Sequence, residues 1–278
     1  MISIVSYELE IISPRAVANT EGVGRGNVGA IYLNNFCLAI DSSMYVSTGD
    51  LFRSNVETHF KAPVKFLIIT HYHADHTFGM KSFKDLVSIS SAQVSKNLQS
   101  TDVLERYKGY IIELEKDDPL GKGVEFILPN FLFTESLIIN DENLSVEINH
   151  VGGHTSGSSF VFFPEEKILF AGDLIFEDKF PYAGDVTCDP EKWITAMKRM
   201  RALNPDFIIP GHGPVMKGSD KLDRHEKFFI ELRSIIKDAI TDGLKQEEIE
   251  VPTTFDNIDP ELKLLTVDHW LKYYKTQI

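Results

Sequence analysis

Five histidines and two aspartates in this sequence have the types and spacing of metal ligands. The hexapeptide His71-Tyr72-His73-Ala74-Asp75-His76 holds three imidazoles and one carboxylate in a row of six residues. In an extended segment, residues i and i+2 point to the same side, so His71 and His73 can bind one ion. If the chain then turns into a helix, Asp75 and His76 face a neighbouring point. One short segment can therefore serve two metal ions.

Three further donors each follow a separate apolar run and are flanked by glycine. His154 lies in a Gly-rich turn after LSVEIN, Asp173 follows ILF and a glycine, and His212 lies between two glycines after FII. Glycine lets the backbone turn sharply and bring each donor toward a shared point. Each donor alone is more typical of an ordinary loop. Four strand ends that present only His and Asp predict a shared site, because sites gather at the carboxyl ends of strands.

The elements that must position these donors can be read from apolar periodicity. Short apolar runs predict strands, and charged and apolar residues at spacings of three and four predict helices. Strands in two groups with interleaved helices favour a layered α/β fold. We expect strands at Ile2–Ile12, Ala30–Asn34, Phe36–Ile40, Phe66–Thr70, Ile168–Ala171 and Phe207–Ile209, β-like runs between Phe126 and Phe163, and helices at Ala92–Asp117, Pro190–Leu203, Lys221–Gly243 and Glu261–Tyr274.

One glycine-rich segment, Gly24 to Gly29, matches the letters of a dinucleotide-binding pattern, G-x-G-x-x-G. That pattern binds a cofactor only when it follows a strand and opens a helix. Here the preceding PRAVANTEG is a poor strand, and the following AIYLNNFCLAID is β-like. We therefore interpret the segment as a Gly-rich turn between strands.

Composition excludes several classes of protein. The 278 residues include 28 Lys and Arg against 41 Asp and Glu, a net charge of −13 that disfavours binding to nucleic-acid phosphates. The sequence contains no run of eighteen apolar residues, so we expect no membrane span. Its N-terminus does not resemble a signal peptide. We expect a cytoplasmic protein with a single domain over residues 1–278, a helical insertion near 92–135 and a helical C-terminal extension over 219–278.

In chain order, the candidate donors resemble the signature of the metallo-β-lactamase-fold hydrolase superfamily. That signature has an Asp after an early strand (here Asp41), H-x-H-x-D-H, a His in a Gly-rich turn, an Asp after Gly, and a final G-H, and all five parts occur here. Within the superfamily the chain is similar to the generic hydrolase, glyoxalase II-like and lactonase-like branches. The resemblance implies an α/β fold, a four-layer αβ/βα sandwich with the metals at one edge between two sheets.

The resemblance also implies a role for each donor. His71, His73 and His154 would hold the first metal, Asp75, His76 and His212 the second, Asp173 would bridge both, and Asp41 would orient ligands through hydrogen bonds. We expect two divalent ions, Zn²⁺ first, with Fe and Mn as alternatives. A metal-bound hydroxide would attack the substrate, and Asp75 or Asp173 would carry the proton to the leaving group.

The expected substrate is a small-molecule ester, lactone, thioester or amide. The bridging Asp173 argues against a dedicated β-lactamase, and Phe176 stands where related lactonases usually carry Tyr. A mononuclear iron enzyme similar to persulfide dioxygenases, and a β-lactamase, stay open as alternatives. We expect no nucleic-acid or membrane partner and leave a homodimer open. Phe176, Phe180 and Tyr182 are candidates for the pocket wall.

Overall fold

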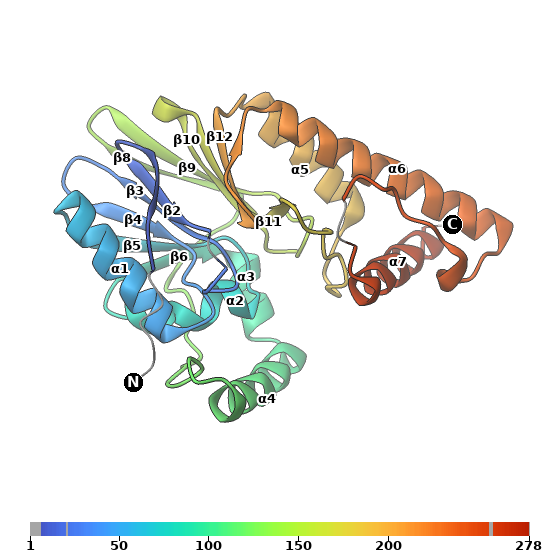
Figure 1. Ribbon diagram of the computed structural model, residues 1–278, viewed down its shortest axis with the longest axis horizontal. Helices are drawn as coiled ribbons and strands as arrows, with labels where there is room; N and C mark the ends of the chain where they lie inside the picture. Colours follow the sequence, from blue (N-terminus) through green and yellow to red (C-terminus); the bar gives the residue numbers. More distant parts are fainter. Residues whose placement is uncertain (1–6, 21, 256–257, 278) are drawn as a thin grey trace.

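The computed structural model describes residues 7–20, 22–255 and 258–277. Its centre is a pair of β-sheets, one of seven strands and one of six, packed against each other with helices on their outer faces (Figure 1). The strand calls that fall on residues 2–6 lie outside the described residues.

The first sheet contains β1 to β7 in chain order. Strands β1 to β4 pair antiparallel, whereas β4 to β7 pair parallel, so the carboxyl ends of β4 and β5 meet at one edge. The strands are β1 (Glu10–Ser13), β2 (Ala16–Asn19), β3 (Val28–Tyr32), β4 (Cys37–Ile40), β5 (Val64–Ile69), β6 (Val87–Ser91) and β7 (Phe131–Phe133).

The second sheet has the order β13-β12-β11-β10-β9-β8, and only β11 and β12 pair parallel in it. Its strands are β8 (Ser136–Asp141), β9 (Leu144–His150), β10 (Ser159–Phe163), β11 (Ile168–Phe176), β12 (Phe207–His212) and β13 (Met216–Lys217). The helices are α1 (Val46–Phe60), α2 (Ala74–Thr77), α3 (Ala92–Leu98), α4 (Thr101–Asp117), α5 (Pro190–Ala202), α6 (Asp220–Asp242) and α7 (Pro260–Lys275), with 3₁₀ turns η1 (Phe78–Phe83), η2 (Pro164–Glu166) and η3 (Gln246–Glu248).

Three buried apolar clusters separate the layers. One joins α1 to the outer face of the first sheet through Phe52, and another joins the second sheet to α5 and α6 through Trp193. The third lies between the sheets and contains Ile68 and Phe163. Strands β4, β10 and β11 are buried along their whole length because both of their faces are covered. The four-layer sandwich expected from the sequence is confirmed.

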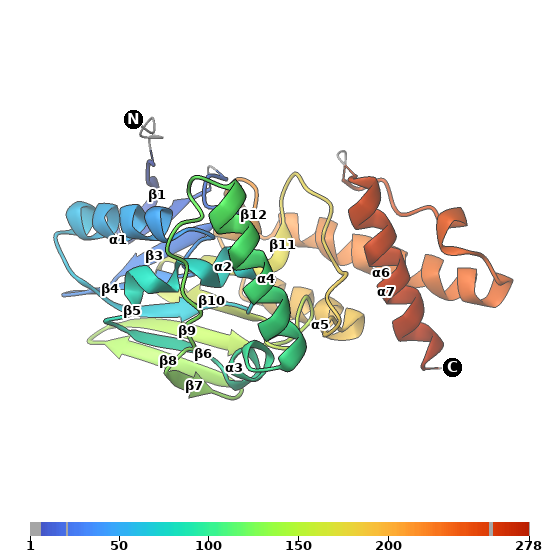
Figure 2. The same cartoon turned by 90° about the horizontal axis from the view of Figure 1, so that it is seen from below.

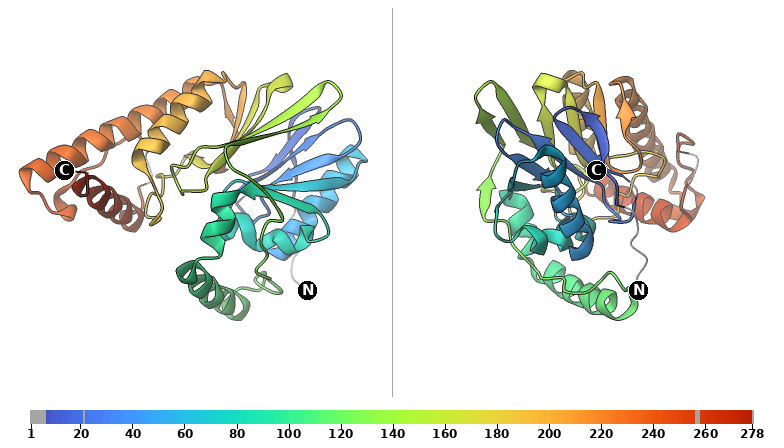
Figure 3. Two further views of the ribbon diagram at one scale, coloured as in Figure 1. Left: turned by 180° about the vertical axis from the view of Figure 1, so that it is seen from behind. Right: turned by 60° about the vertical axis from the view of Figure 1, so that its left-hand side comes forward.

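Two helical regions project from the sandwich on the side of its metal-ligand candidates. Helix α4 lies beyond the first sheet, and α7 lies beyond the second, with the loop after β11 between them (Figure 2). The view from behind shows the same arrangement (Figure 3). The range 92–135 holds α3, α4 and β7, and the described part of 219–278 holds α6, η3 and α7. Among the described residues, no helix is long and apolar enough to span a bilayer.

Several elements differ from the sequence-based expectations. Helix α1 was not predicted, because Thr48, Gly49 and other weak helix formers obscure its pattern and its stability comes from packing. The predicted helix over 92–117 is two helices, with a break where the Ser100 hydroxyl donates to the Asn97 carbonyl at 2.8 Å. The stretch judged a poor strand contains β2. The Gly-rich segment after it is irregular only as far as Asn27, and its last two residues, Val28 and Gly29, begin β3.

Candidate metal centre

The seven candidate donors converge at the edge where the two sheets meet. His71 and His73 follow β5, and Asp75 and His76 lie on the short helix α2 directly after them. The turn between β9 and β10 supplies His154. Their donor atoms fall into two groups, each with all atoms within 4.8 Å of one another: His71, His73, His154 and Asp173, and then Asp75, His76 and His212.

Asp173 lies inside a strand, which corrects the expectation that every donor stands at a strand end. Strand β11 continues to Phe176, and its pairing with β12 shifts register on either side of Gly172, which has φ +51°. This irregularity re-aims the side chain of Asp173 within the strand. A Cβ on Gly211 of β12 would lie 1.9 Å from Asp173 Oδ1, so only glycine leaves room for the carboxylate.

Hydrogen bonds fix the protonation of the first group of histidines. His154 Nδ1 lies 3.0 Å from the Tyr182 carbonyl oxygen, which can only accept, so Nδ1 carries the proton. His73 Nε2 donates in the same way to Asp185 at 2.9 Å. The atoms left without protons, His73 Nδ1 and His154 Nε2, face each other at 3.0 Å. Two lone pairs at this distance repel, so either a proton or a metal cation must lie between these nitrogens.

Asp41 orients one histidine of each group, His76 directly and His71 through Thr70. Its carboxylate accepts from the Thr70 backbone and hydroxyl, both at 2.8 Å, and from His76 Nδ1 at 2.8 Å. His71 Nδ1 then donates to the Thr70 hydroxyl at 3.1 Å. These bonds leave Nε2 of His71 and His76 as lone-pair donors aimed inward. Asp41 has φ +60°, a costly conformation for a residue with a side chain, as found at functional sites.

A further observation indicates that the site suits divalent cations. Three of the inward-facing atoms are buried without any hydrogen-bond partner. They are Nε2 of His71, Nε2 of His76 and Oδ1 of Asp173. His76 Nε2 lies 3.0 Å from Asp173 Oδ1, but the two atoms do not have hydrogen-bond geometry. Buried polar atoms are normally paired, and metal ions are one way to satisfy them. Imidazole nitrogen and carboxylate oxygen suit zinc and its first-row neighbours.

The pKa shifts differ between the two groups of donors. Burial lowers the pKa of His154 to about 4, so its imidazole is neutral at pH 7. Burial also disfavours charge on His212, but the carboxylates of Asp173 and Asp75, each 3.3 Å from its Nε2, outweigh this and raise its pKa to about 9. The carboxylates therefore favour a positive charge at this point in the site.

One residue that contacts the donors, Asp185, was not predicted from the sequence. It lies in the loop after β11, is buried, and accepts from His73, from the Tyr72 hydroxyl and from the backbone and hydroxyl of Thr187. Burial would raise the pKa of Asp185, but the hydrogen bonds from His73 and Thr187 hold it well below its usual value. No local motif marks this aspartate, because only the folded loop brings it to His73.

The Gly-rich turn is also part of the site, which the sequence did not reveal. A Cβ on Gly26 would lie 2.6 Å from the Asp75 carbonyl oxygen and 2.8 Å from His76 Nε2. The next residue, Asn27, donates from its side chain to the carbonyls of Pro210 and Gly213, both at 2.8 Å. The turn thus packs over one ligand pair and fastens the loop that carries His212.

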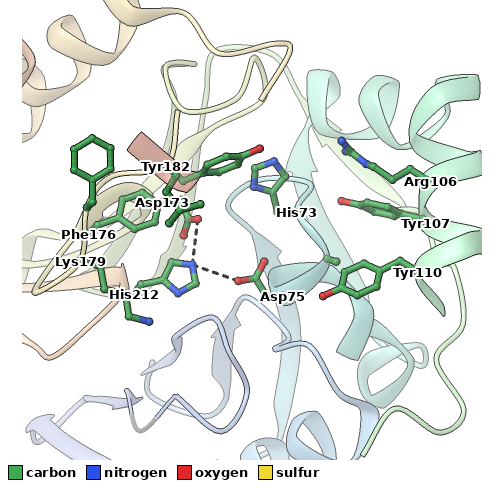
Figure 4. Close-up of a pocket in the computed structure, with 13 residues that line it drawn as sticks. His73, Asp75, Arg106, Tyr107, Tyr110, Asp173, Phe176, Lys179, Tyr182 and His212 are labelled. Atoms are coloured by element: carbon green, nitrogen blue, oxygen red, sulfur yellow. Dashed lines mark ion pairs between the residues drawn. The ribbon is translucent and has the colours of Figure 1, made fainter. Parts of the chain in front are cut away.

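A cavity of about 420 Å³ opens onto the donors (Figure 4). The three residues proposed as pocket wall, Phe176, Phe180 and Tyr182, line it together with Tyr107 and Tyr110 of α4. Ring stacking of Phe176 on His212, with centroids 5.2 Å apart, joins the wall to the donor set. The volume suits a small molecule.

Comparison with known proteins agrees with this architecture. A family model described as the metallo-beta-lactamase superfamily matches residues 22–212, most of the chain and all seven donors. The chain belongs to this family. The metallo-beta-lactamase type 2 of Bacteroides fragilis is 25% identical over 232 residues, covering 81% of this chain and 84% of that protein. By family, the chain falls among metal-dependent hydrolases.

Other relatives carry different names. A linear primary-alkylsulfatase from Pseudomonas sp. (strain ATCC 19151) is 24% identical over 58% of this chain and 36% of its own length. An acyl-coenzyme A thioesterase of Gallus gallus is 24% identical over 64% of this chain and 66% of its own. The chain spans only 36% and 53% of the first two curated relatives, so their full activities are not transferred to it.

Solved structures share the fold of this metallo-beta-lactamase family member. A metallo-beta-lactamase from Pontibacter korlensis matches with a TM-score of 0.61 at 20% identity, over 80% of this chain and 98% of that one. A stereoselective inverting sec-alkylsulfatase from Pseudomonas sp. matches with a TM-score of 0.71 at 14% identity, over 97% of this chain and 50% of that one. At these identities, the likeness establishes the fold alone.

Proposed function

We propose that this protein is a dinuclear metal-dependent hydrolase of small-molecule esters, thioesters, lactones or amides. The observation that carries the proposal is the convergence of seven donors beside a cavity, in two groups whose ligand atoms each lie within 4.8 Å of one another. Two divalent cations, Zn²⁺ in the first instance, would supply an acidified water as nucleophile and polarise the bond under attack.

Two carboxylates of the chain, Asp173 and Asp75, have different proposed roles at the metal centre. Asp173 is buried and belongs to the first group of donors, yet lies 3.3 Å from His212 of the second, as expected of a bridging ligand. Asp75 is 24% exposed and lines the cavity. Its pKa is held well below the usual value because the attraction of His76 and His212 outweighs the effect of burial. Asp75 is therefore ionised, as a metal ligand must be, and we propose that this carboxylate carries the proton to a leaving group in the cavity.

Metal content and turnover test the proposal together. Purified protein should contain two equivalents of metal per chain by elemental analysis, lose ester or thioester hydrolysis on chelation, and recover it with Zn²⁺, Mn²⁺ or Fe²⁺. One iron per chain with oxygen consumption on a persulfide would instead identify a mononuclear oxidoreductase. Hydrolysis that survives complete metal removal would reject the proposal.

A variant of Asp75 tests the roles assigned to this carboxylate. Asp75→Ala should abolish turnover and reduce bound metal, because it removes a ligand as well as the proton acceptor. Asp238→Ala is a matched control, since Asp238 is an exposed carboxylate on α6. Full turnover by Asp75→Ala would contradict the assigned role.

A further inference from the structure

The cavity beside the donors has two different kinds of lining. Most of its wall is aromatic or aliphatic, and Leu262 of α7 completes the apolar side opposite α4. Two cationic side chains also line it: Arg106 from α4 and Lys179 from the loop after β11 (Figure 4). They approach from opposite sides of the donors, one with α4 and the other beside Phe176 and His212. The cavity therefore combines an apolar body with separate positive charges.

Neither of these cations forms an ion pair with any residue that the structure describes. The contrast is Arg25, which also lies near the site but is paired with Asp118 at 3.4 Å and donates to the hydroxyls of Tyr45 and Tyr110. Arg106 instead lies over the ring of Tyr107, with its guanidinium carbon 5.6 Å from the ring centroid, which places the guanidinium beside the cavity. An unpaired guanidinium fixed in this way is prepared to bind an oxyanion with its planar fork.

The charges of the metal centre leave these cations uncompensated. Four carboxylates contact the histidine donors: Asp41, Asp75, Asp173 and Asp185. Two divalent cations would balance those four negative charges. Of the described residues that line the cavity, the only acidic ones are Asp75 and Asp173, both in the donor set. With metals bound, the charge of Arg106 and Lys179 is available to a ligand.

We propose that the substrate is an ester or thioester with an apolar body and a second, oxyanionic group, and that Arg106 binds this group while Lys179 adds to the positive field. This inference rests on the proposed function, because it assigns the substrate class of the same site. Arg106 also lines a second cavity of about 350 Å³, but that cavity includes the acidic Asp102 as well as Val103 and Val186, so the proposed anion is assigned to the first cavity.

Two esters that differ only at the far end of the acyl chain test the preference. Mono-4-nitrophenyl glutarate carries a carboxylate where 4-nitrophenyl valerate carries a methyl group. The zinc-loaded protein should hydrolyse the glutarate with kcat/KM about tenfold or more above the valerate, which is the scale of one charge-assisted hydrogen bond. The difference should shrink as salt is added. Equal kcat/KM for the two esters would overturn the inference.

Variants identify the cation responsible. Arg106→Gln should raise KM for the glutarate about tenfold and KM for the valerate much less, with metal content at the wild-type value. Lys179→Gln should remove a smaller part of the preference. Lys108→Gln is the control, because Lys108 is an exposed cation on the same helix and does not line the cavity. Arg106→Gln behaving like Lys108→Gln would assign no anion site to Arg106.

A binding measurement keeps this test separate from the proposed function. Calorimetry with 4-phenylbutyrate and its neutral analogue 4-phenylbutan-1-ol requires no turnover. The zinc-loaded wild type should bind the carboxylate more tightly, and Arg106→Gln should lose about tenfold in affinity for the carboxylate alone. If neither ester is hydrolysed but this loss is observed, esters are not substrates and the anion site stands. Equal binding by both proteins would reject the site.

Discussion

Two regions meet at the cavity, and they are built differently. The floor consists of the seven donors with Asp41 and Asp185. The rim consists of α4, residues 176–184 and α7. Most side chains of the floor are hydrogen-bonded to the sandwich or lie in a core strand, and Asp75 lies on α2 beside His212. The rim mixes buried residues such as Tyr107 with exposed ones such as Arg106. The floor supplies chemistry that needs exact placement.

We expect the rim to tolerate change more readily than the floor, because the rim provides none of the seven donors. Helix α4 touches the floor chiefly through Tyr107, whose hydroxyl donates to the Tyr72 carbonyl at 2.6 Å. Helix α7 reaches the loop after β11 through Thr266, whose hydroxyl accepts from the Ala183 backbone at 3.1 Å. A fold can therefore vary these segments and its substrate while the metal chemistry of the floor stays the same.

The largest effect should come from the residue that belongs to both halves of the floor. Asp173→Ala removes the carboxylate that contacts His76 at 3.0 Å and His212 at 3.3 Å. We expect both metals to be lost and turnover to fall to background. Elemental analysis and a zinc titration measure the loss. If one metal remained at full affinity, the two groups would be independent sites.

Weakening a hydrogen-bond partner of a metal ligand should reduce metal affinity less than removing the ligand Asp173. Asp185→Asn keeps the shape of the side chain but weakens its hold on His73 Nε2, so affinity at the first metal group should fall roughly 10–100-fold. The second group should be unaffected, which competition with a chromophoric chelator can resolve into two steps. Asp178→Asn in the same loop is the control, because Asp178 is exposed and its φ of +57° suits Asn. An equal loss at both groups would mean that Asp185 acts through the loop fold instead.

The floor was largely predictable from the sequence because its donors are dense in the chain. Three imidazoles and a carboxylate in six residues, followed by glycine-flanked donors after apolar runs, specify both residue type and approximate position. Asp173 was predicted as a donor and lies among the converging residues, although it lies within β11 and not at its end. Periodicity cannot show a register shift, which depends on pairing with another strand.

The rim could not be predicted in the same way. Arg106 is one of several charged residues on an amphipathic helix, and nothing local distinguishes it from Lys108. Asp185 and Asn27 gain their roles only through contacts with residues distant in sequence, at His73 and at Pro210. The sequence predicted a helical insertion and a pocket wall, but the identity of the groups that face a ligand required the fold.

A smaller effect, on stability and on metal binding, is expected when the link between the Gly-rich turn and the loop of His212 is removed. Asn27→Ala removes two hydrogen bonds and leaves the buried carbonyls of Pro210 and Gly213 unpaired. We expect a loss of about 1–3 kcal/mol in the free energy of unfolding, measured by urea denaturation, with weaker binding at the second metal group. Asn34→Ala, whose side-chain bonds are long at 3.4 and 3.5 Å, should change stability by only about 0.5 kcal/mol. Equal losses would show that Asn27 does not fasten this loop.

The smallest effect should come from the apolar rim. Leu262→Ala removes part of the cavity wall on α7 without touching a donor, so metal content should stay at the wild-type value. KM for substrates with an apolar body should rise by roughly three- to tenfold, since a lost methylene contact is worth about 1 kcal/mol. Leu264→Ala on the same helix is the matched control, because Leu264 is 39% exposed and does not line the cavity. A change in kcat or in bound metal for Leu262→Ala would mean that rim and floor are coupled. It would contradict the view that the rim affects substrate binding without affecting the metal centre.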